Sequence, residues 1–223
     1  MAVQLEFLKS IPYFAGMNPG ELDLIKQQIF EKTAERGEVV LLEGESAEAL
    51  FFVASGVVKA FKTSAEGKEQ ILYLIRPGES FNDVSIFVDG PNLASAQALG
   101  PVTVYGLRKS ELQVILRDYP QVTLNIIKVL ADRAHQLILL VEDLSFRRVI
   151  NRVAKILLKH AGDGTDPMPR LTQQVMADMA GTAREVVARS LKALEQEGVI
   201  RLEHNRIAIT NKGDLKQMVE SAI

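Results

Sequence analysis

The chain has 223 residues and a formal net charge of −2, and 47% of its residues are hydrophobic, which allows two packed cores. It contains no cysteine, which excludes disulfides, thiolate zinc sites, cysteine-ligated iron–sulfur clusters and thiol redox sensing. Because no apolar run reaches membrane-spanning length, and Glu6 and Lys9 interrupt the N-terminus, we expect a soluble cytoplasmic protein without a signal peptide.

Short strands separated by glycines are predicted for most of the first half of the chain. An amphipathic helical region comes first, followed by a helix expected to begin at Pro19-Gly20 and to run to Phe30. After Gly37, glycines at 44, 56, 67 and 78 recur every 11 or 12 residues, with strand-like sequence between them and again over 95–106. A short helix is expected over 79–88. Regular short strands of this kind predict a β-barrel or roll.

A long helix is predicted next, beginning at Pro120, which suits a first helical turn, and running to about Ser145. Its hydrophobic residues alternate in steps of three and four, the a/d pattern of a two-stranded coiled coil. These residues are Ile127, Leu130, Ala134, Leu137, Val141 and Leu144. The same stripe could pack against the chain's own domain. We favour a homodimer seam, because Ile138, Leu139 and Leu140 make the helix apolar on several sides.

Residues 171–200 predict two short helices separated by a turn at Gly181. Thr172 is a candidate N-cap for the first helix, and Gly181-Thr182 supplies the turn and the cap of the second, which is expected to start at Ala183. After Gly198, residues 199–210 read as two short strands around 203–205, which predicts a β-wing.

The second of these helices is expected to expose a face suited to DNA. Its apolar residues recur at helical spacing and turn Arg184, Glu185 and Arg189 to the opposite side. An arginine there can hold guanine O6 and N7 with two hydrogen bonds, and a carboxylate can accept from cytosine N4. We therefore predict binding to double-stranded DNA. We also assign to the DNA-binding surface the residues at the two helix starts, Thr172, Thr182 and Ala183.

Charge is distributed unevenly along the chain. Residues 146–223 hold 13 Lys and Arg against 9 Asp and Glu, a net of +4, which leaves −6 for the rest. An acidic larger part joined to a basic smaller one is expected when only the smaller part approaches phosphates. The asymmetry argues against the alternative interpretation, a helical hairpin that carries ordinary surface arginines.

Together these segments resemble the CRP/FNR family of bacterial transcription regulators over nearly all of the chain. The resemblance is carried by RGEVVLLEGE at 36–45, EGKEQILYLIRPGE at 66–79, LSFRRVINRVAKILL at 144–158 and GTAREVVARSLKALE at 181–195. It implies an α+β fold with an effector-sensing, cyclic-nucleotide-binding-type β-roll (jelly-roll) over 1–118, a dimerisation helix over 119–145 and a winged helix-turn-helix over 146–223.

The resemblance also implies what the DNA-binding part reads. In cyclic-AMP-responsive members of the family an RExxxR helix reads a TGTGA half-site, so a TGTGA-type palindrome is implied here. Ala188 stands where relatives often have Gly or Ser, which leaves the outer bases of the half-site open. An effector would shift the dimer between two arrangements through a hinge at 144–146, and one arrangement would set the recognition helices about 34 Å apart. The loop 66–69 matches one that contacts RNA polymerase in relatives, although a solvated turn explains it equally well.

The implied effector pocket consists of Gly78, Glu79, Leu93, Ala94, Leu137 and Ile138. Gly78-Glu79 matches the family's phosphate-binding cassette. Leu93 stands where cyclic-AMP binders have arginine, and Leu137 and Ile138 replace the hydroxyl pair that reaches the adenine. An unpaired buried phosphate costs several kcal/mol, so control by cyclic AMP is not expected. Constitutive activity and a hydrophobic effector both remain open.

The stretch PNLASAQA at 91–98 resembles the haem-binding, nitric-oxide-sensing branch of the family. Haem needs an axial ligand. His160 and His204 lie in the DNA-binding part, which leaves His135 on the central helix as the candidate. A lone helix histidine is more often a surface residue. No cofactor or metal is therefore assigned, and haem ligation by His135 stays an alternative.

Two other classes of protein fit the sequence less well. A stand-alone cyclic-nucleotide-binding regulatory module would share the roll but lack the helix-turn-helix, and residues 184–189 speak against it. An enzyme is not expected, because the chain shows no Ser-His-Asp set, HExxH motif or phosphate-cradling GxxxxGK.

Overall fold

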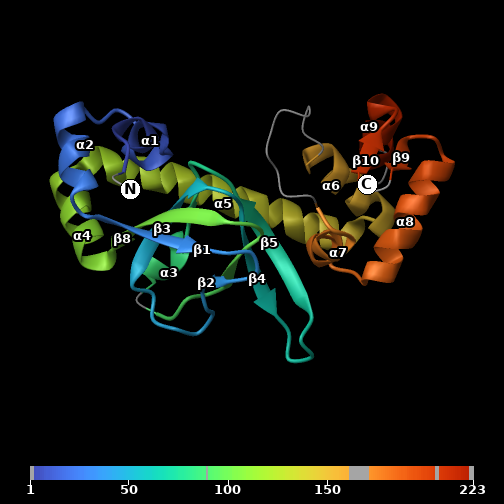
Figure 1. Cartoon of the computed structure of the whole chain (residues 1–223), viewed down its shortest axis with the longest axis horizontal. Coiled ribbons are helices and arrows are strands. Elements are labelled where there is room, and N and C mark those ends of the chain that lie inside the picture. The colour runs from blue at the N-terminus through green and yellow to red at the C-terminus, as the bar shows by residue number, and fades with distance from the viewer. Residues whose placement is uncertain (1–2, 89, 161–170, 204–205, 221–223) are drawn as a thin grey trace. The chain divides into compact units, whose positions relative to one another are not determined.

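The computed structural model describes residues 3–88, 90–160, 171–203 and 206–220 (Figure 1). They fall into two compact units, one formed by residues up to Lys62 together with Tyr73–Gln136, and the other by Thr63–Leu72 together with the chain from Leu137 onward. Among the described residues, no helix is both long enough and apolar enough to cross a membrane.

The first unit opens with short helical segments: α1 (Leu5–Ser10), the 3-10 helix η1 (Pro12–Phe14) and α2 (Pro19–Lys26). The predicted start of α2 is confirmed, and a capping box fixes it, because the Asn18 side chain accepts from the Glu21 N–H at 3.0 Å and the Glu21 carboxylate accepts from the Asn18 N–H at 2.8 Å. The predicted end at Phe30 is wrong. Phe30 lies in a strand and pairs with Gly106, a tertiary contact that overrides the helical pattern.

Two four-stranded sheets form the predicted roll. One has the order β1 (Ile29–Ala34), β8 (Val102–Arg108), β3 (Ala49–Ser55), β6 (Ser80–Phe81), and the other β2 (Val39–Leu41), β7 (Ser95–Ala98), β4 (Val58–Thr63), β5 (Glu69–Ile75). Both sheets contribute to one buried core, in which the Phe51 and Phe81 rings stack with centroids 5.2 Å apart. A Cβ at Gly106 would lie 2.1 Å from Cζ of the Phe30 ring, so the pairing of Phe30 with position 106 between β1 and β8 favours glycine.

Three helices complete the first unit and lead out of it. They are α3 (Asp83–Phe87), α4 (Lys109–Asp118) and the first part of α5 (Pro120–Phe146). The predicted long helix is confirmed from Pro120, and it ends one residue beyond the predicted Ser145. One face of α5 is buried here at Val122, Asn125 and Ile126. The Asn125 amide donates to the carbonyls of Tyr13 at 3.0 Å and Ala15 at 2.9 Å.

The second unit contains the winged helix-turn-helix predicted from the sequence. Its elements are the end of α5, then α6 (Val149–His160), α7 (Gln173–Ala180), α8 (Arg184–Gln196), β9 (Ile200–Glu203), β10 (Arg206–Ile209) and α9 (Lys212–Glu220). β9 and β10 pair in an antiparallel hairpin. His204 and Asn205 of the predicted turn lie outside the described residues. A separate core formed by α6, α7, α8 and α9 holds the unit together.

Candidate nucleic-acid interface

The first helix of the pair, α7, begins where the sequence predicts. The Thr172 hydroxyl accepts from the Val175 N–H at 3.1 Å, which satisfies one of the free donors at the helix start. Met176, Ala177 and Ala180 are buried in the unit's core, while Gln174 is exposed. α7 is therefore fixed by its cap and its apolar face.

A tight turn at Gly181 joins α7 to α8. Gly181 has a left-handed backbone with φ of 61°, and the N–H of Thr182 donates to the Ala177 carbonyl at 3.0 Å. A Cβ at position 181 would lie 2.7 Å from Leu144 Cδ2 and 2.8 Å from Gln70 Oε1. The left-handed backbone favours glycine, and a larger residue would also displace the ends of the Leu144 and Gln70 side chains, so the turn between the two helices depends on this residue.

The start of α8 differs from the prediction. Its N-cap position is Ala183 rather than Thr182, and no side chain caps it. The free N–H groups of its first turn therefore have no side-chain partner. Uncapped N–H groups at an exposed helix start suit a phosphate oxygen, both by their geometry and through the helix dipole.

One face of α8 is buried and the other is open to solvent. Val187, Leu191 and Leu194 are fully buried in the core. Arg184, Glu185 and Arg189 are exposed, and none of the three forms a hydrogen bond or ion pair with any described residue. Their charged groups are available to an external partner.

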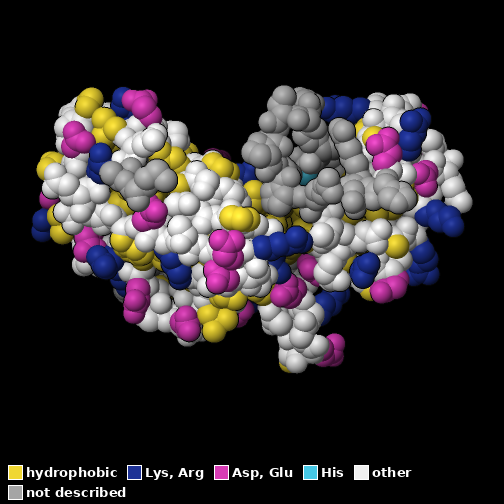
Figure 2. Space-filling model, in the orientation of Figure 1, with side chains coloured by type: hydrophobic (Ala, Val, Ile, Leu, Met, Phe, Trp, Pro, Cys, Tyr) yellow, Lys and Arg dark blue, Asp and Glu magenta, His cyan; other side chains and the backbone are white. Residues whose placement is uncertain are grey.

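Lys192 extends this face by one helical turn. It is exposed on α8 three residues after Arg189 and seven after Glu185, which places the three side chains on one side of the helix. The sequence prediction omitted it, although its spacing from Arg189 was the available signal. Figure 2 shows Lys and Arg side chains in several places on the part of the molecule that holds α8 and α9.

The residues assigned to an effector pocket are mostly engaged within the roll. The Gly78 N–H donates to the Val53 carbonyl at 2.9 Å, and the Glu79 carboxylate accepts from the Arg76 N–H at 2.7 Å. The Leu93 side chain is exposed, its N–H donates to the Ser85 hydroxyl at 3.0 Å, and its carbonyl accepts from Lys62 at 2.9 Å. These backbone groups are therefore not free for a ligand.

The remaining pocket residues are distributed between the two units. Ala94 is half-buried in the first unit, beside Leu93 in the chain. Leu137 and Ile138 belong to the second unit, where Leu137 is half-buried and Ile138 is exposed. The structure thus groups Gly78, Glu79, Leu93 and Ala94 in one unit and the two α5 residues in the other.

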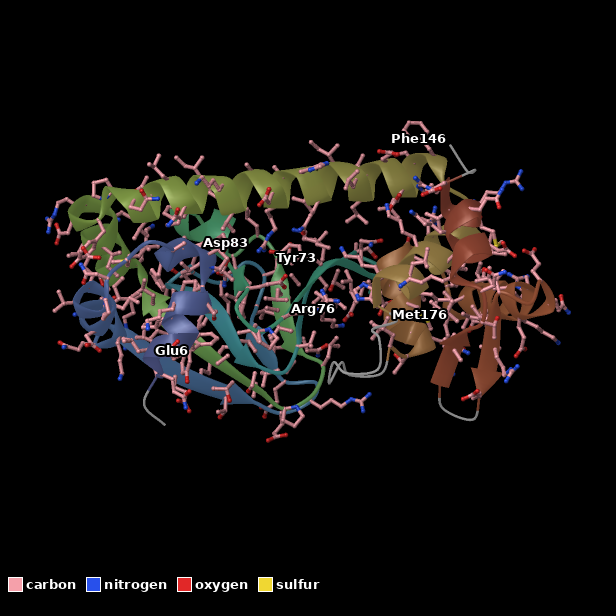
Figure 3. All side chains as sticks on the ribbon, turned by 90° about the horizontal axis from the view of Figure 1, so that it is seen from above. Glu6, Tyr73, Arg76, Asp83, Phe146 and Met176 are labelled. Carbon is pink, nitrogen blue, oxygen red and sulfur yellow. The ribbon has the colours of Figure 1, made fainter. Side chains whose placement is uncertain are left out.

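A buried ion pair, which the sequence prediction missed, links α3 to α5 within the first unit. Asp83 and Arg133 approach to 3.3 Å, and Arg133 also donates to the Ser80 carbonyl at 3.0 Å. The guanidinium lies 4.2 Å from the centre of the Tyr73 ring, and Figure 3 labels Asp83 and Tyr73. Burial raises the pKa of Asp83, while the Arg133 charge lowers it. The two residues are fifty positions apart, so no local pattern reveals the pair.

The described residues show no group of metal ligands built around the candidate haem ligand. His135 is exposed on α5. Within the described residues, no group of three or more His, Asp or Glu side chains is placed to hold a metal ion. Haem ligation by His135 stays a prediction.

Comparison with known families divides the chain into two parts. Residues 31–119 match the family described as "Cyclic nucleotide-binding domain", and residues 151–218 match "Crp-like helix-turn-helix domain". Among curated proteins, "Cyclic AMP receptor protein" of Thermus thermophilus is 34% identical and covers 95% of this chain and 98% of its own length. "CRP-like cAMP-activated global transcriptional regulator" of Mycobacterium tuberculosis is 30% identical, covering 92% and 95%.

Solved structures match this chain over most of its length. The catabolite activator protein of Thermus thermophilus matches with a TM-score of 0.55 and 33% identity, over 95% of this chain and 100% of that one. FixK2 of Bradyrhizobium japonicum matches with a TM-score of 0.74 and 24% identity, over 85% and 96%, and supports the fold alone.

Proposed function

Because the chain belongs to the CRP/FNR family of transcription regulators, we propose that it binds DNA as a homodimer, at a palindrome of two TGTGA-type half-sites, and that it does so without cyclic AMP. Family membership confirms the prediction of a DNA-binding transcription regulator rather than an enzyme. The half-site, the dimer and independence from cyclic AMP belong to the proposal. Its place of action would be the cytoplasm, where bacterial DNA lies.

The exposed and unpartnered charges of α8 carry the proposal. Two guanidinium groups and one carboxylate extend from a helix whose opposite face is buried, so they can enter a major groove while the core of the second unit stays packed. Arg184 and Arg189 are suited to guanine, and Glu185 to the cytosine amino group. Thr172, Thr182 and Ala183, at the helix starts, are proposed to contact the DNA backbone.

An exposed apolar stripe along α5 supports the dimer. Ile127, Ala134 and Val141 of the predicted seam are exposed, whereas Leu130 is half-buried against the core of the first unit. The stripe that is open to solvent consists of Leu124, Ile127, Ala131, Ala134, Ile138 and Val141. Its steps of three and four are those of a two-stranded coiled coil. We therefore propose this stripe as the seam, with Leu130, Leu137 and Leu144 at its flank.

The surroundings of Leu93 support independence from cyclic AMP. An aliphatic side chain offers no donor to a phosphate, and the backbone groups of Leu93 are already bonded to Ser85 and Lys62. Arg133, a buried cation on α5, is paired with Asp83. The names of the Thermus and Mycobacterium relatives include cyclic AMP, so control by this nucleotide is the second candidate function. Contact of 66–69 with RNA polymerase stays a prediction.

A titration of DNA by the purified protein tests the proposal. Fluorescence anisotropy would follow binding to a duplex that carries TGTGA-N6-TCACA, at a stated salt concentration, with and without cyclic AMP, and a scrambled duplex is the control. We expect tight, specific binding without the nucleotide. Binding that requires cyclic AMP would favour the second candidate. Equal affinity for the palindrome and the scrambled duplex would refute the proposed half-site.

A further inference from the structure

The last turns of α5 are compactly joined to the DNA-binding unit. The boundary between the two units falls between Gln136 and Leu137, in the middle of α5 rather than at its end. Residues 137–146 therefore belong with α6, α7 and α8, and Figure 3 labels Phe146 at the end of α5 and Met176 in α7. A specific set of contacts must hold this part of α5 in place.

Arg152 provides contacts that join three helices. It lies on α6, where it is half-buried. Its Nε donates to the Ala180 carbonyl at the end of α7 at 2.8 Å, and its Nη1 donates to the Arg147 carbonyl just after α5 at 2.8 Å. A longer contact of 3.5 Å runs to the Asp143 carbonyl. The carbonyls at the end of a helix lack partners inside it, and one guanidinium bonds both the Ala180 carbonyl that ends α7 and the Arg147 carbonyl that follows α5.

Asp143 forms a second set of contacts beside the first. Its carboxylate pairs with Arg147 at 2.8 Å and with Lys155 of α6 at 2.5 Å. The Arg147 guanidinium in turn donates to the Val219 carbonyl in α9. Burial lowers the pKa of Arg152, although a guanidinium keeps its charge at any ordinary pH. A half-buried cation loses part of its contact with water, so its hydrogen bonds to the carbonyl oxygens favour one geometry around it.

We propose that Arg152 is a positioning residue that fastens the end of α5 to the turn of the helix-turn-helix, so that the recognition helix α8 moves with the last turns of α5 as one body. Residues 144–146, predicted from the sequence as a hinge, would then be braced. The orientation of α8 relative to the dimer seam would be transmitted through Arg152. This inference rests on the proposed function, because it concerns how two recognition helices are spaced on a palindrome.

The spacing of the two half-sites provides a test that separates positioning from loss of charge. Wild type, Arg152→Ala, Arg152→Lys and Arg148→Ala would be titrated with palindromes whose central spacer is five, six, seven or eight base pairs. Arg148 is the matched control, because it is exposed between α5 and α6, forms no side-chain hydrogen bond or ion pair with the described residues, and its loss removes the same charge. Arg152→Lys keeps the charge but lacks the fork that reaches two carbonyls.

A rigid dimer should prefer one spacer. We expect Arg152→Ala and Arg152→Lys to reduce that preference by roughly tenfold, the effect of losing about one charge-assisted hydrogen bond, while Arg148→Ala keeps the wild-type ratio between spacers. A general loss of stability would weaken all spacers equally and would not change this ratio. Equal ratios in all four proteins, or a wild type that prefers the palindrome to a scrambled duplex but tolerates every spacer, would overturn the proposal.

Hydrogen exchange without DNA makes the test independent of the proposed half-site. Arg152→Ala should raise the exchange rate of amides over residues 140–150 by roughly tenfold, and Arg148→Ala should not. If the wild type shows no preference for the palindrome, the proposed function fails, while faster exchange still supports the brace. Unchanged exchange would overturn the brace even if the palindrome is bound. Arg152→Gln, which retains a donor, replaces the alanine variant if that variant does not fold.

Discussion

The charged groups of α8 can act on DNA because no other described residue engages them. Arg184 and Arg189 are exposed, and the helix that carries them is held from behind by Val187 and Leu191. These side chains can bind a base edge without first breaking a hydrogen bond or ion pair to another described residue. The residues that position α7 and α8, by contrast, have structural roles: Gly181 adopts a left-handed backbone in the turn, and Thr172 caps α7.

Replacing Arg184 by alanine tests the assignment of the reading face. We expect specific DNA binding to weaken by roughly 1–3 kcal/mol, because a bidentate contact to guanine is lost, while the dimer stays intact. Anisotropy titration and light scattering measure the two quantities. Arg36→Ala, which removes an equal charge from an exposed position in the roll, is the control. Unchanged specific affinity in Arg184→Ala would show that another face reads the DNA.

Asp83 gives the stability of the protein a defined dependence on pH. Burial raises its pKa above the ordinary 3.8, so the folded protein binds this proton more tightly than the unfolded chain does. The stabilisation from the protonated carboxyl is therefore complete below about pH 4 and is lost as the pH rises through the folded-state pKa.

Asp83→Asn has no carboxyl group to titrate at this position, so it should not lose stability there as the pH rises. Its free energy of unfolding, relative to wild type, is expected to improve as the pH rises from about 4 to 7. Urea denaturation at a series of pH values measures the difference. Asp23→Asn, at an exposed position on α2, is the control. A difference that stays constant with pH, or that changes with the opposite sign, would contradict the raised pKa.

At the scale of the element, α5 has two apolar faces, one packed in the first unit and one open to solvent. Val122 and Ile126 are buried in the first unit, whereas Leu124, Ile127 and Ala131 are open to solvent. A helix that is apolar on both sides needs a partner for the second side. In the proposed dimer a second copy of the same helix would cover this side with matching residues.

A charge placed in the stripe should separate the dimer. We expect Ala131→Glu to weaken dimerisation by roughly 2 kcal/mol or more, because two carboxylates would meet at the seam without partners. Analytical ultracentrifugation measures the change. Gln136→Glu adds the same charge at an exposed position off the stripe and should leave the dimer intact. A stable dimer of Ala131→Glu would place the seam on another face.

The elements that sequence predicts well are those with a local cause. Pro120 marks the start of α5, Thr172 caps α7, and the spacing of Val187, Leu191 and Leu194 orients α8. The end of α2, the register of the exposed stripe and the pair between Asp83 and Arg133 depend on contacts with distant segments. Leu130 belongs to an a/d pattern, but it packs on the first unit's core, and that competition is invisible in the spacing alone.

At the scale of the whole molecule, two compact units share one helix. Most of the roll and the first part of α5 form one unit, and Thr63–Leu72 and the last turns of α5 belong with the winged helix-turn-helix. The residues from 146 onward carry a net charge of +4. The unit that is proposed to approach DNA is therefore the basic one, and Thr63–Leu72 of the roll belongs to it.

The division of α5 also determines how this protein could be recombined with a relative. A hybrid that takes its sensing part from another parent should be joined between 136 and 137, because a junction at 146 would replace Asp143 and separate Arg147 and Lys155 from their shared carboxylate. Gln70, which borders Gly181, would have to be carried across with the second unit. Hybrids joined at 136 should keep the binding preference of their DNA-reading parent, and those joined at 146 should lose part of it.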